Sequence, residues 1–221
     1  MQQSEANNDN ENIERKNFSA KYTGVFLSNI VAVPYVNITC DMHNVGELKG
    51  LKEAYERGEK VVLLASKDCI PNPTIDDFCD IGCVCEIKQF RENGQDAEVM
   101  MMGLQRVKVE KIHSIMPDFI LTATPLSEVN ANTVLAFQKM NAVKGELREL
   151  NRKERFLPPM LENQLLNQDM DPGKFADMMI HLVAKGDMKI QQSLLEMIDV
   201  EERLNEIVRL MENVKQVLAL K

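Results

Sequence analysis

The hydrophobic pattern of this 221-residue chain changes character near residue 130. Before that point, runs rich in β-branched residues at 22–40, 60–66 and 97–126 alternate with turn-forming residues, as is typical of strands in a sheet. After it, apolar residues recur every three or four positions, which is the spacing of one helix face. We therefore expect an α+β protein in which a β-rich region, 18–128, precedes a helical bundle, 129–221.

The β-rich region is expected to contain one helix and a long hairpin. Apolar residues from Leu48 to Tyr55 have helical spacing, and Gly58 is suited to end the helix in a left-handed conformation. The pair Asn93-Gly94 lies between two β runs and favours a hairpin turn. Pro34 interrupts an earlier run, which favours two short strands on either side of it.

The second region carries clear helix boundaries. A helix from about Asn132 to Arg155 should end before Pro158-Pro159, because the residue preceding a proline is disfavoured in the helical conformation. Asp171-Pro172 has the residues of an N-cap and a first helical position. Asp199 and Glu202 have the spacing of a capping box, and they open a last helix that we expect to be truncated by the chain end.

That last helix has apolar residues in alternating steps of four and three, which is the heptad spacing of a coiled coil. We call them the seam residues: Val200, Leu204, Ile207, Met211, Val214 and Leu218. Such a seam can pack inside the chain's own bundle or against another chain, and both alternatives stay open. The seam residues are therefore candidates for assembly as well as for the core.

Composition and charge narrow the function classes. With 44% hydrophobic and 27% charged residues the chain has the composition of a folded globular protein. Its net charge of -8 opposes binding to a phosphate backbone, so nucleic acid is not an expected partner. No run approaches the ~20 apolar residues of a membrane helix. Residues 1–17 are rich in Asn, Gln and Glu, and we expect a disordered tail, no signal peptide and a cytoplasmic protein.

The stretch FCDIGCVCEI, 78–87, holds three of the five cysteines. In a strand, Cys79, Cys83 and Cys85 fall on the same face as neighbouring isoleucines. Side chains on one strand face are about 6.5 Å apart, whereas two thiolates on one zinc ion approach to about 4 Å. We favour small buried hydrophobes, with a thiol or metal enzyme as the alternative.

No other pattern indicates chemistry. A G-x-S-x-G nucleophile elbow is absent, and so is the phosphate-binding pattern G-x-x-x-x-G-K-[ST]. The nearest approach to the latter, DPGKF at 171–175, is interpreted as a helix cap. We therefore expect no catalytic residue, no cofactor site and no metal site in this chain.

Two places are candidates for contact with a polypeptide. Met100, Met101 and Met102 lie in an expected strand and cannot all face one core, because successive side chains alternate. Methionine adapts to irregular partners, so an outward-facing member could contact unfolded polypeptide, unless the strand is covered on both faces. Tyr35, next to Pro34 at a strand end, is the second candidate.

From Thr23 to Lys221 the chain resembles the N-terminal region of Lon, the ATP-dependent serine protease. The resemblance is carried by IVAVP at 30–34, EKVVLLASKD at 59–68, GLQRVKV at 103–109, DPGKFAD at 171–177 and LLEMIDVEERL at 194–204. Phe26, Tyr35 and Thr39 stand where this family usually has proline or glycine. The Asn-rich tail matches no part of the family.

The resemblance implies a PUA-like pseudo-barrel with one helix, followed by a helical bundle whose last, long helix leads toward an ATPase module. It implies recognition of unfolded or damaged polypeptides and assembly with other Lon subunits into a hexamer. The ATPase motifs and the serine-lysine dyad of the family are not in this sequence, so we expect no enzyme activity here, and ATP and Mg only in the missing module. The alternative is a standalone Lon-N-like adaptor or ligand-binding protein.

Overall fold

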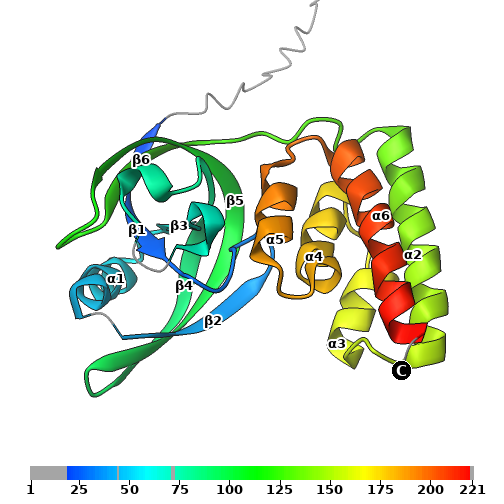
Figure 1. Ribbon diagram of the computed structural model, residues 1–221, viewed down its shortest axis with the longest axis horizontal. Helices are drawn as coiled ribbons and strands as arrows, with labels where there is room; N and C mark the ends of the chain where they lie inside the picture. The colour runs from blue at the N-terminus through cyan, green and yellow to red at the C-terminus, as the bar shows by residue number, and fades with distance from the viewer. Residues whose placement is uncertain (1–18, 44, 71–72, 220–221) are drawn as a thin grey trace, which may run out of the picture.

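The computed structural model describes residues 19–43, 45–70 and 73–219, without the side chains of 45–47, 69 and 217–219. A β-rich part lies beside a group of helices, and α5 faces the sheet (Figure 1). The expected tail, 1–17, falls outside the described residues.

One mixed sheet forms the β-rich part. Its strands are β1 (Ala20–Phe26), β2 (Asn37–Met42), β3 (Val61–Leu64), β4 (Ile81–Asn93), β5 (Asp96–Ser114) and β6 (Ile120–Pro125). They follow the order β2-β5-β4-β3-β1-β6, and β5 also pairs with β6, which closes the sheet into a barrel. β1 and β3 are parallel and the other pairs antiparallel. Among the described strands, β2 pairs only with β5 and therefore extends the barrel at an edge.

The predicted long hairpin is β4 and β5. Asn93 pairs with Asp96, so the two connecting residues are Gly94 and Gln95. Gly94 has a φ of 68°, as the first central position of a type II′ turn requires. The turn is therefore centred one residue later than the Asn-Gly signal suggests, because the register places the glycine first.

The helix expected in the β-rich part is α1 (Val45–Arg57), and it ends at Gly58 with a φ of 65°. It packs on β1, β4 and β5. Leu51 and Ala54 bury its inner face against the barrel, as the helical spacing predicted.

The second half of the chain is helical. Its helices are α2 (Val134–Glu154), α3 (Pro159–Glu162), α4 (Pro172–Ala184), α5 (Met188–Glu196) and α6 (Val200–Ala219). The predicted caps are present: the Asp171 carboxylate accepts from Lys174 N at 2.8 Å, and that of Asp199 accepts from Glu202 N at 3.1 Å. α3, α5 and a π-helical turn at Asn163–Asn167 were not predicted individually.

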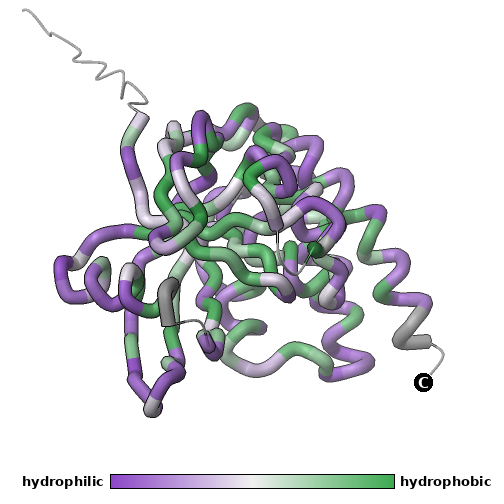
Figure 2. Tube along the Cα trace, turned by 60° about the vertical axis from the view of Figure 1, so that its left-hand side comes forward, coloured by the Kyte–Doolittle hydropathy of each residue, from purple (hydrophilic) through white to green (hydrophobic). Residues whose placement is uncertain are grey.

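Buried apolar side chains form three clusters, two of which lie on the two sides of the sheet. The third and largest joins α2, α4, α5 and α6, and it also includes Val31, Val33, Ala65 and Cys79 from the β-rich part. Hydrophobic residues fill the inside of both halves (Figure 2). The strands before residue 128 and the helices after it therefore share a continuous packed cluster.

The seam residues of α6 face the chain's own bundle. Val200, Leu204 and Ile207 are fully buried, and Met211 and Val214 are nearly so, because α6 packs between α2 and α4. The side chain of Leu218 lies outside the described part. Of the two alternatives, the structure selects packing within the chain. Because the described seam residues are buried there, they are no longer candidates for contact with another subunit.

Cys79, Cys83 and Cys85 lie in the core. Cys83 and Cys85 pack in one cluster with Ile87, whereas Cys79, which precedes β4, packs in the cluster shared with the helices. A hydrogen bond with Cys83 and burial both raise the pKa of the Cys85 thiol. Among the side chains that the structure describes, no three His, Cys, Asp or Glu are grouped as metal ligands. No helix over residues 19–219 is long and apolar enough to cross a membrane.

Candidate polypeptide-binding site at the junction

Segments far apart in sequence meet where the barrel faces the helices. Arg106 comes from β5, Glu128 from the connection after β6, Asp177 from α4 and Arg203 from α6. We call these four residues the junction network. Three of them lie in segments that carry the resemblance described above, so those segments converge on one place.

The centre of the junction network is a buried ion pair. Arg106 is 3% exposed and Asp177 is 0% exposed. The guanidinium donates to both carboxylate oxygens of Asp177, at 2.7 Å from Nη1 to Oδ2 and through Nη2 to Oδ1. Arg106 Nε also donates to the carbonyl of Leu195 at 2.8 Å, which ties β5 to the end of α5. A bidentate pair of this kind fixes both distance and orientation.

Arg203 completes the network from the side of α6. Its Nε lies 3.3 Å from Asp177 Oδ1, its Nη1 donates to the Met197 carbonyl at 2.6 Å, and its Nη2 donates to the Glu128 carboxylate. Glu128 also accepts from Arg106 Nη1 at 3.2 Å. The network therefore has two positive and two negative groups, so its buried charges are balanced.

Burial by itself would lower the pKa of Arg106. The hydrogen bonds and charge of Asp177, together with the charge of Glu128, outweigh that effect and raise the pKa above its ordinary value. Arg106 therefore stays charged at every physiological pH. The network is a permanent ionic link between the two halves of the chain.

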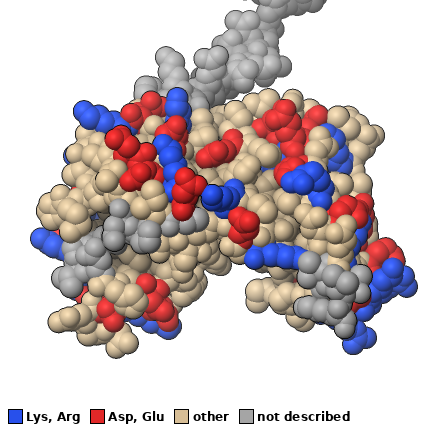
Figure 3. Space-filling model, in the orientation of Figure 1, with Lys and Arg blue, Asp and Glu red and all other residues tan. Residues whose placement is uncertain are grey.

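A hollow of about 390 Å³, which we call the junction groove, lies over this network. It is lined by Pro34, Tyr35, Leu104, Gln105, Arg106, Leu126, Ser127, Glu128 and Asp177. The charged residues among them are engaged with one another, so the groove offers shape, apolar surface and an aromatic ring rather than a reactive group. On the face drawn in Figure 3, acidic and basic side chains are interspersed across both halves of the molecule.

Tyr35 stands at this groove with its side chain 46% exposed. Its backbone has a φ of 64°, and its N–H donates to the Gly103 carbonyl at 2.8 Å. A Cβ on Gly103 would lie 2.0 Å from the Val33 carbonyl oxygen, so only glycine allows this close contact. The loop is thus held rigidly in a conformation that a non-glycine residue adopts only at some cost.

The Tyr35 ring also has charged neighbours. Lys174 Nζ lies 5.5 Å from the ring centroid, within the range of a cation–π contact. Partial burial, and then the negative charges of Asp171 and Glu128, raise the pKa of the Tyr35 hydroxyl. The hydroxyl therefore stays protonated, and the ring is neutral.

The three methionines are divided between two faces, as alternation requires. Met101 is 0% exposed in the cluster that also holds Cys83 and Cys85, so its prediction as a contact for polypeptide is wrong. Met100 and Met102 are half-buried on the other face, where they pair across the sheet with Thr39 and Asn37. Together with Tyr35 they remain candidate contacts.

Sequence reasoning missed the junction network as a set. One signal was available: Asp177 is an acid inside PGKFADMMIHLVA, a helix whose other residues nearby are apolar. It also missed an exposed apolar patch on the first turns of α2, formed by Val134, Leu135 and Phe137. Gln138, Asn141 and Gly145 occupy the positions that would continue an apolar stripe from Val134, so the helical period gave no signal for this patch.

A family model described as the ATP-dependent protease La (LON) substrate-binding domain matches residues 25–213. The chain belongs to this family. The Lon protease of Desulforamulus reducens is 25% identical over 184 residues, which cover 82% of this chain and 22% of that protein. The Lon protease of Erwinia amylovora is 28% identical over 194 residues, covering 85% and 24%. The chain thus spans about a quarter of the length of these relatives.

Solved structures agree with the LON assignment at the level of the fold. The N-terminal domain of the Mycobacterium avium complex Lon protease superposes with a TM-score of 0.65 at 18% identity, covering 87% of this chain and 98% of that one. A Lon N-terminal domain protein from Xanthomonas campestris gives a TM-score of 0.57 at 16% identity, covering 86% and 98%. Both the barrel and the helices are therefore those of Lon N-terminal domains.

Proposed function

We propose that this chain is the non-catalytic region of an ATP-dependent Lon protease that recognises unfolded or damaged polypeptides. The observation that carries the proposal is Tyr35: a large, half-exposed aromatic residue that lines a groove and whose backbone is hydrogen-bonded to β5. A preorganised aromatic anchor binds with little loss of conformational entropy. Unfolded polypeptides expose the apolar side chains that such an anchor accepts.

Half-buried Met100 and Met102 on β5 are further apolar candidates for contact with polypeptide. Met102 precedes Gly103, whose carbonyl accepts the hydrogen bond from Tyr35, so the methionine and the aromatic ring belong to adjoining backbone. Methionine is flexible and polarizable, which suits binding of many different sequences. The rigid ring and the adaptable methionines together favour broad recognition of polypeptides.

The test compares two tyrosines of similar exposure. Tyr35 is 46% exposed and Tyr55, on α1, is 40% exposed. Binding of a reduced and alkylated, permanently unfolded protein is measured by fluorescence anisotropy with Tyr35→Ala and Tyr55→Ala variants. We expect Tyr35→Ala to weaken binding about tenfold, the effect of a single interface anchor, and Tyr55→Ala to leave it unchanged. Equal effects of the two variants, or no binding by the unsubstituted chain, would refute the proposal.

The proposal places the chemistry outside this chain. A serine-lysine dyad would cleave the peptide, and ATP with Mg would drive an ATPase module, in the longer cytoplasmic protein of which this is one region. A direct test is proteolysis by that longer protein of the same unfolded probe with and without ATP. ATP-independent cleavage, or cleavage by the 221-residue chain alone, would contradict it.

Assembly into a hexamer is also part of the proposal. Because the seam residues are buried, the patch of Val134, Leu135 and Phe137 on α2 is the better supported contact with another subunit: their exposed fractions are 75%, 46% and 40%. Sedimentation of the longer protein should show a smaller assembly for Phe137→Glu than for Gln138→Glu. An unchanged assembly in both variants would remove this patch from the interface.

A further inference from the structure

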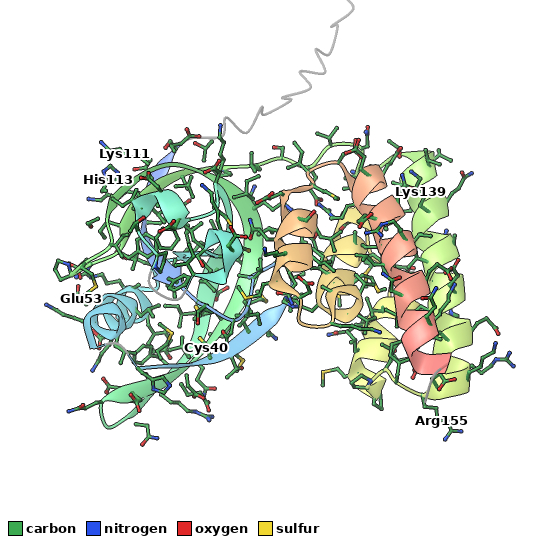
Figure 4. All side chains as sticks on the ribbon, viewed as in Figure 1. Cys40, Glu53, Lys111, His113, Lys139 and Arg155 are labelled. Carbon is green, nitrogen blue, oxygen red and sulfur yellow. The ribbon has the colours of Figure 1, made fainter. Side chains whose placement is uncertain are left out.

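A second hollow, which we call the edge groove, lies along β2 and has a volume of about 940 Å³. One side is formed by β2 from Thr39 to Met42 and by His43, which follows it. The other side includes the apolar side chains of Phe26, Ile30 and Met116, the last of which is 62% exposed. Cys40, labelled in Figure 4, belongs to this strand.

The backbone of β2 is paired on one side only. β5 is its partner over all six residues, in a register without shifts. In the part of the chain that the structure describes, no other strand pairs with β2. The side away from β5 is therefore a free sheet edge.

The register shows which backbone groups face this free edge. Gly103 N donates to the Val36 carbonyl at 3.1 Å, at the position that precedes the Asn37–Met102 pair. Hydrogen-bonded and non-hydrogen-bonded pairs alternate along an antiparallel ladder. Ile38, Cys40 and Met42 therefore direct their N–H and C=O toward β5. Thr39 and Asp41 direct their N–H and C=O away from β5. Both residues line the edge groove.

Natural sheets usually protect a free edge with lysine, proline, a bulge or a covering segment. β2 has the sequence NITCDM, which contains no lysine or proline, and its ladder with β5 has no register shift from Asn37 to Met42. Thr39 and Asp41 are exposed, and none of the backbone–backbone hydrogen bonds between described segments involves them. The edge is open over a length of about 20 Å.

The chemistry of this edge identifies its occupant. Alternating backbone donors and acceptors are matched by another extended polypeptide backbone, which is the basis of strand addition to a sheet. Apolar side chains on the far side of the groove favour a segment with apolar residues. Asp41 is the one carboxylate among the described lining residues, and these include no lysine or arginine, so an acidic segment would be repelled.

We propose that the free edge of β2 binds an extended, apolar and non-acidic segment of an unfolded polypeptide as an additional β-strand, through the backbone groups of Thr39 and Asp41. This inference rests on the proposed function and specifies how the polypeptide is held. Backbone pairing is independent of side-chain identity, so it suits a protein that binds many sequences. The edge groove supplies pairing, while Tyr35 supplies an anchor at a separate surface.

Amide hydrogen exchange measured by NMR tests this in the 221-residue chain. The probe is a reduced and alkylated, permanently unfolded protein. Without it, the amides of Thr39 and Asp41 should exchange fast, while those of Cys40 and Met42 are protected by β5. With it, exchange at Thr39 and Asp41 should slow by at least about tenfold, as expected for amides that enter a hydrogen-bonded ladder.

The outcomes separate the inference from the proposed function. If the probe binds and Tyr35→Ala weakens binding, but the Thr39 and Asp41 amides keep their exchange rates, the strand addition is wrong and the proposed function stands. If the probe does not bind at all, both fail. Slowed exchange at Thr39 and Asp41 supports both.

A second measurement uses the ligand, so it does not depend on the folding of a variant. An uncharged peptide of about ten residues rich in Val, Leu and Thr is made in two forms, N-methylated at odd or at even positions. Only one set of alternate amides faces β2, so one form should lose at least about tenfold in affinity and the other should keep it. Equal affinities of the two forms would overturn the inference.

Thr39→Pro provides the matching change on the protein. It removes the outward N–H while leaving the bonds from β2 to β5, whereas Thr39→Val keeps the N–H and the side-chain shape. The proline variant should lose peptide affinity and the valine variant should retain it. Loss in both would indicate a side-chain contact and would refute backbone pairing.

Discussion

The junction groove and the edge groove differ in how their polar groups are satisfied. At the junction, four charged side chains from different segments bond to one another and leave a rigid, neutral floor. At the edge, exposed backbone groups of β2 have no partner strand on one side in the described chain. The junction can therefore offer a ligand mainly side-chain contacts, whereas the edge can offer it backbone hydrogen bonds. The molecule therefore combines an aromatic anchor over a preformed ionic network at the junction with an open backbone edge at β2.

The largest effect is expected from breaking the junction network. Asp177→Ala would leave Arg106 and Arg203 buried without their shared carboxylate, which typically costs about 3–5 kcal/mol in the free energy of unfolding. Urea denaturation measures the change. The control is Glu92→Ala, which breaks the exposed ion pair with Lys52 and should have a much smaller effect. If the two variants lose similar stability, the network is not what holds the two halves together.

A smaller loss of stability is expected from adding a Cβ at Gly103, where the backbone packs closely against Val33. Gly103→Ala places a Cβ against the Val33 carbonyl and should destabilise the chain by about 1–3 kcal/mol through overpacking. The control, Gly145→Ala on α2, meets no atom within 4 Å and should stabilise the helix by up to about 1 kcal/mol. Thermal denaturation that shows the same sign for both substitutions would contradict this assignment.

Two substitutions of Tyr35 distinguish the contribution of its ring from that of its backbone conformation. Tyr35→Ala and Tyr35→Gly both remove the ring and should weaken polypeptide binding equally. Because residue 35 has a φ of 64°, the glycine variant should be more stable than the alanine variant by about 1 kcal/mol. Equal stabilities in urea denaturation would mean that the left-handed backbone is not retained in the variants. Unequal binding would point to the loop conformation rather than the ring.

The mildest perturbation is alkylation of Cys40 in the edge groove. Burial, and then the charge of Asp41, raise the pKa of the Cys40 thiol to about 11. The thiolate is the reactive form, so at pH 8 alkylation should be on the order of 100-fold slower than for an ordinary thiol, and it should speed up as the pH rises toward 11. Mass spectrometry follows the modified peptide. Fast alkylation at pH 8 would contradict this environment, and slowing by a bound unfolded protein would support strand addition at β2.

Most elements could be predicted from local pattern, because periodicity reports the face that a segment buries. Alternation predicted that Met100, Met101 and Met102 would divide between two faces, and the caps at Asp171 and Asp199 were visible as sequence signals. Short α3 and α5 were harder to predict, since a helix of four or nine residues has too few turns to establish a period. The hairpin was predictable but its centre was off by one residue, because the register is set by the whole ladder.

The candidate site was only partly predictable. Tyr35 stood out as an aromatic residue beside a proline, whereas the charges of the network did not stand out as partners. Arg106 and Asp177 are 71 residues apart, and no local rule pairs them. The heptad pattern of α6 was equally compatible with packing in the chain's own bundle and with packing against another chain. Only the positions of α2 and α4 decided between these alternatives.

The sequence by itself determined the β-rich and helical regions, the longer helices with their caps, and the similarity of the chain to Lon N-terminal regions. These properties depend on periodicity, caps and residue order within a few tens of residues. The tertiary structure decided which side of β2 is free, which charges neutralise one another and which apolar residues remain exposed. Those properties depend on contacts between segments that are far apart in the sequence and that only the closed barrel and the packed helices bring together. The local sequence pattern does not encode which of these segments meet.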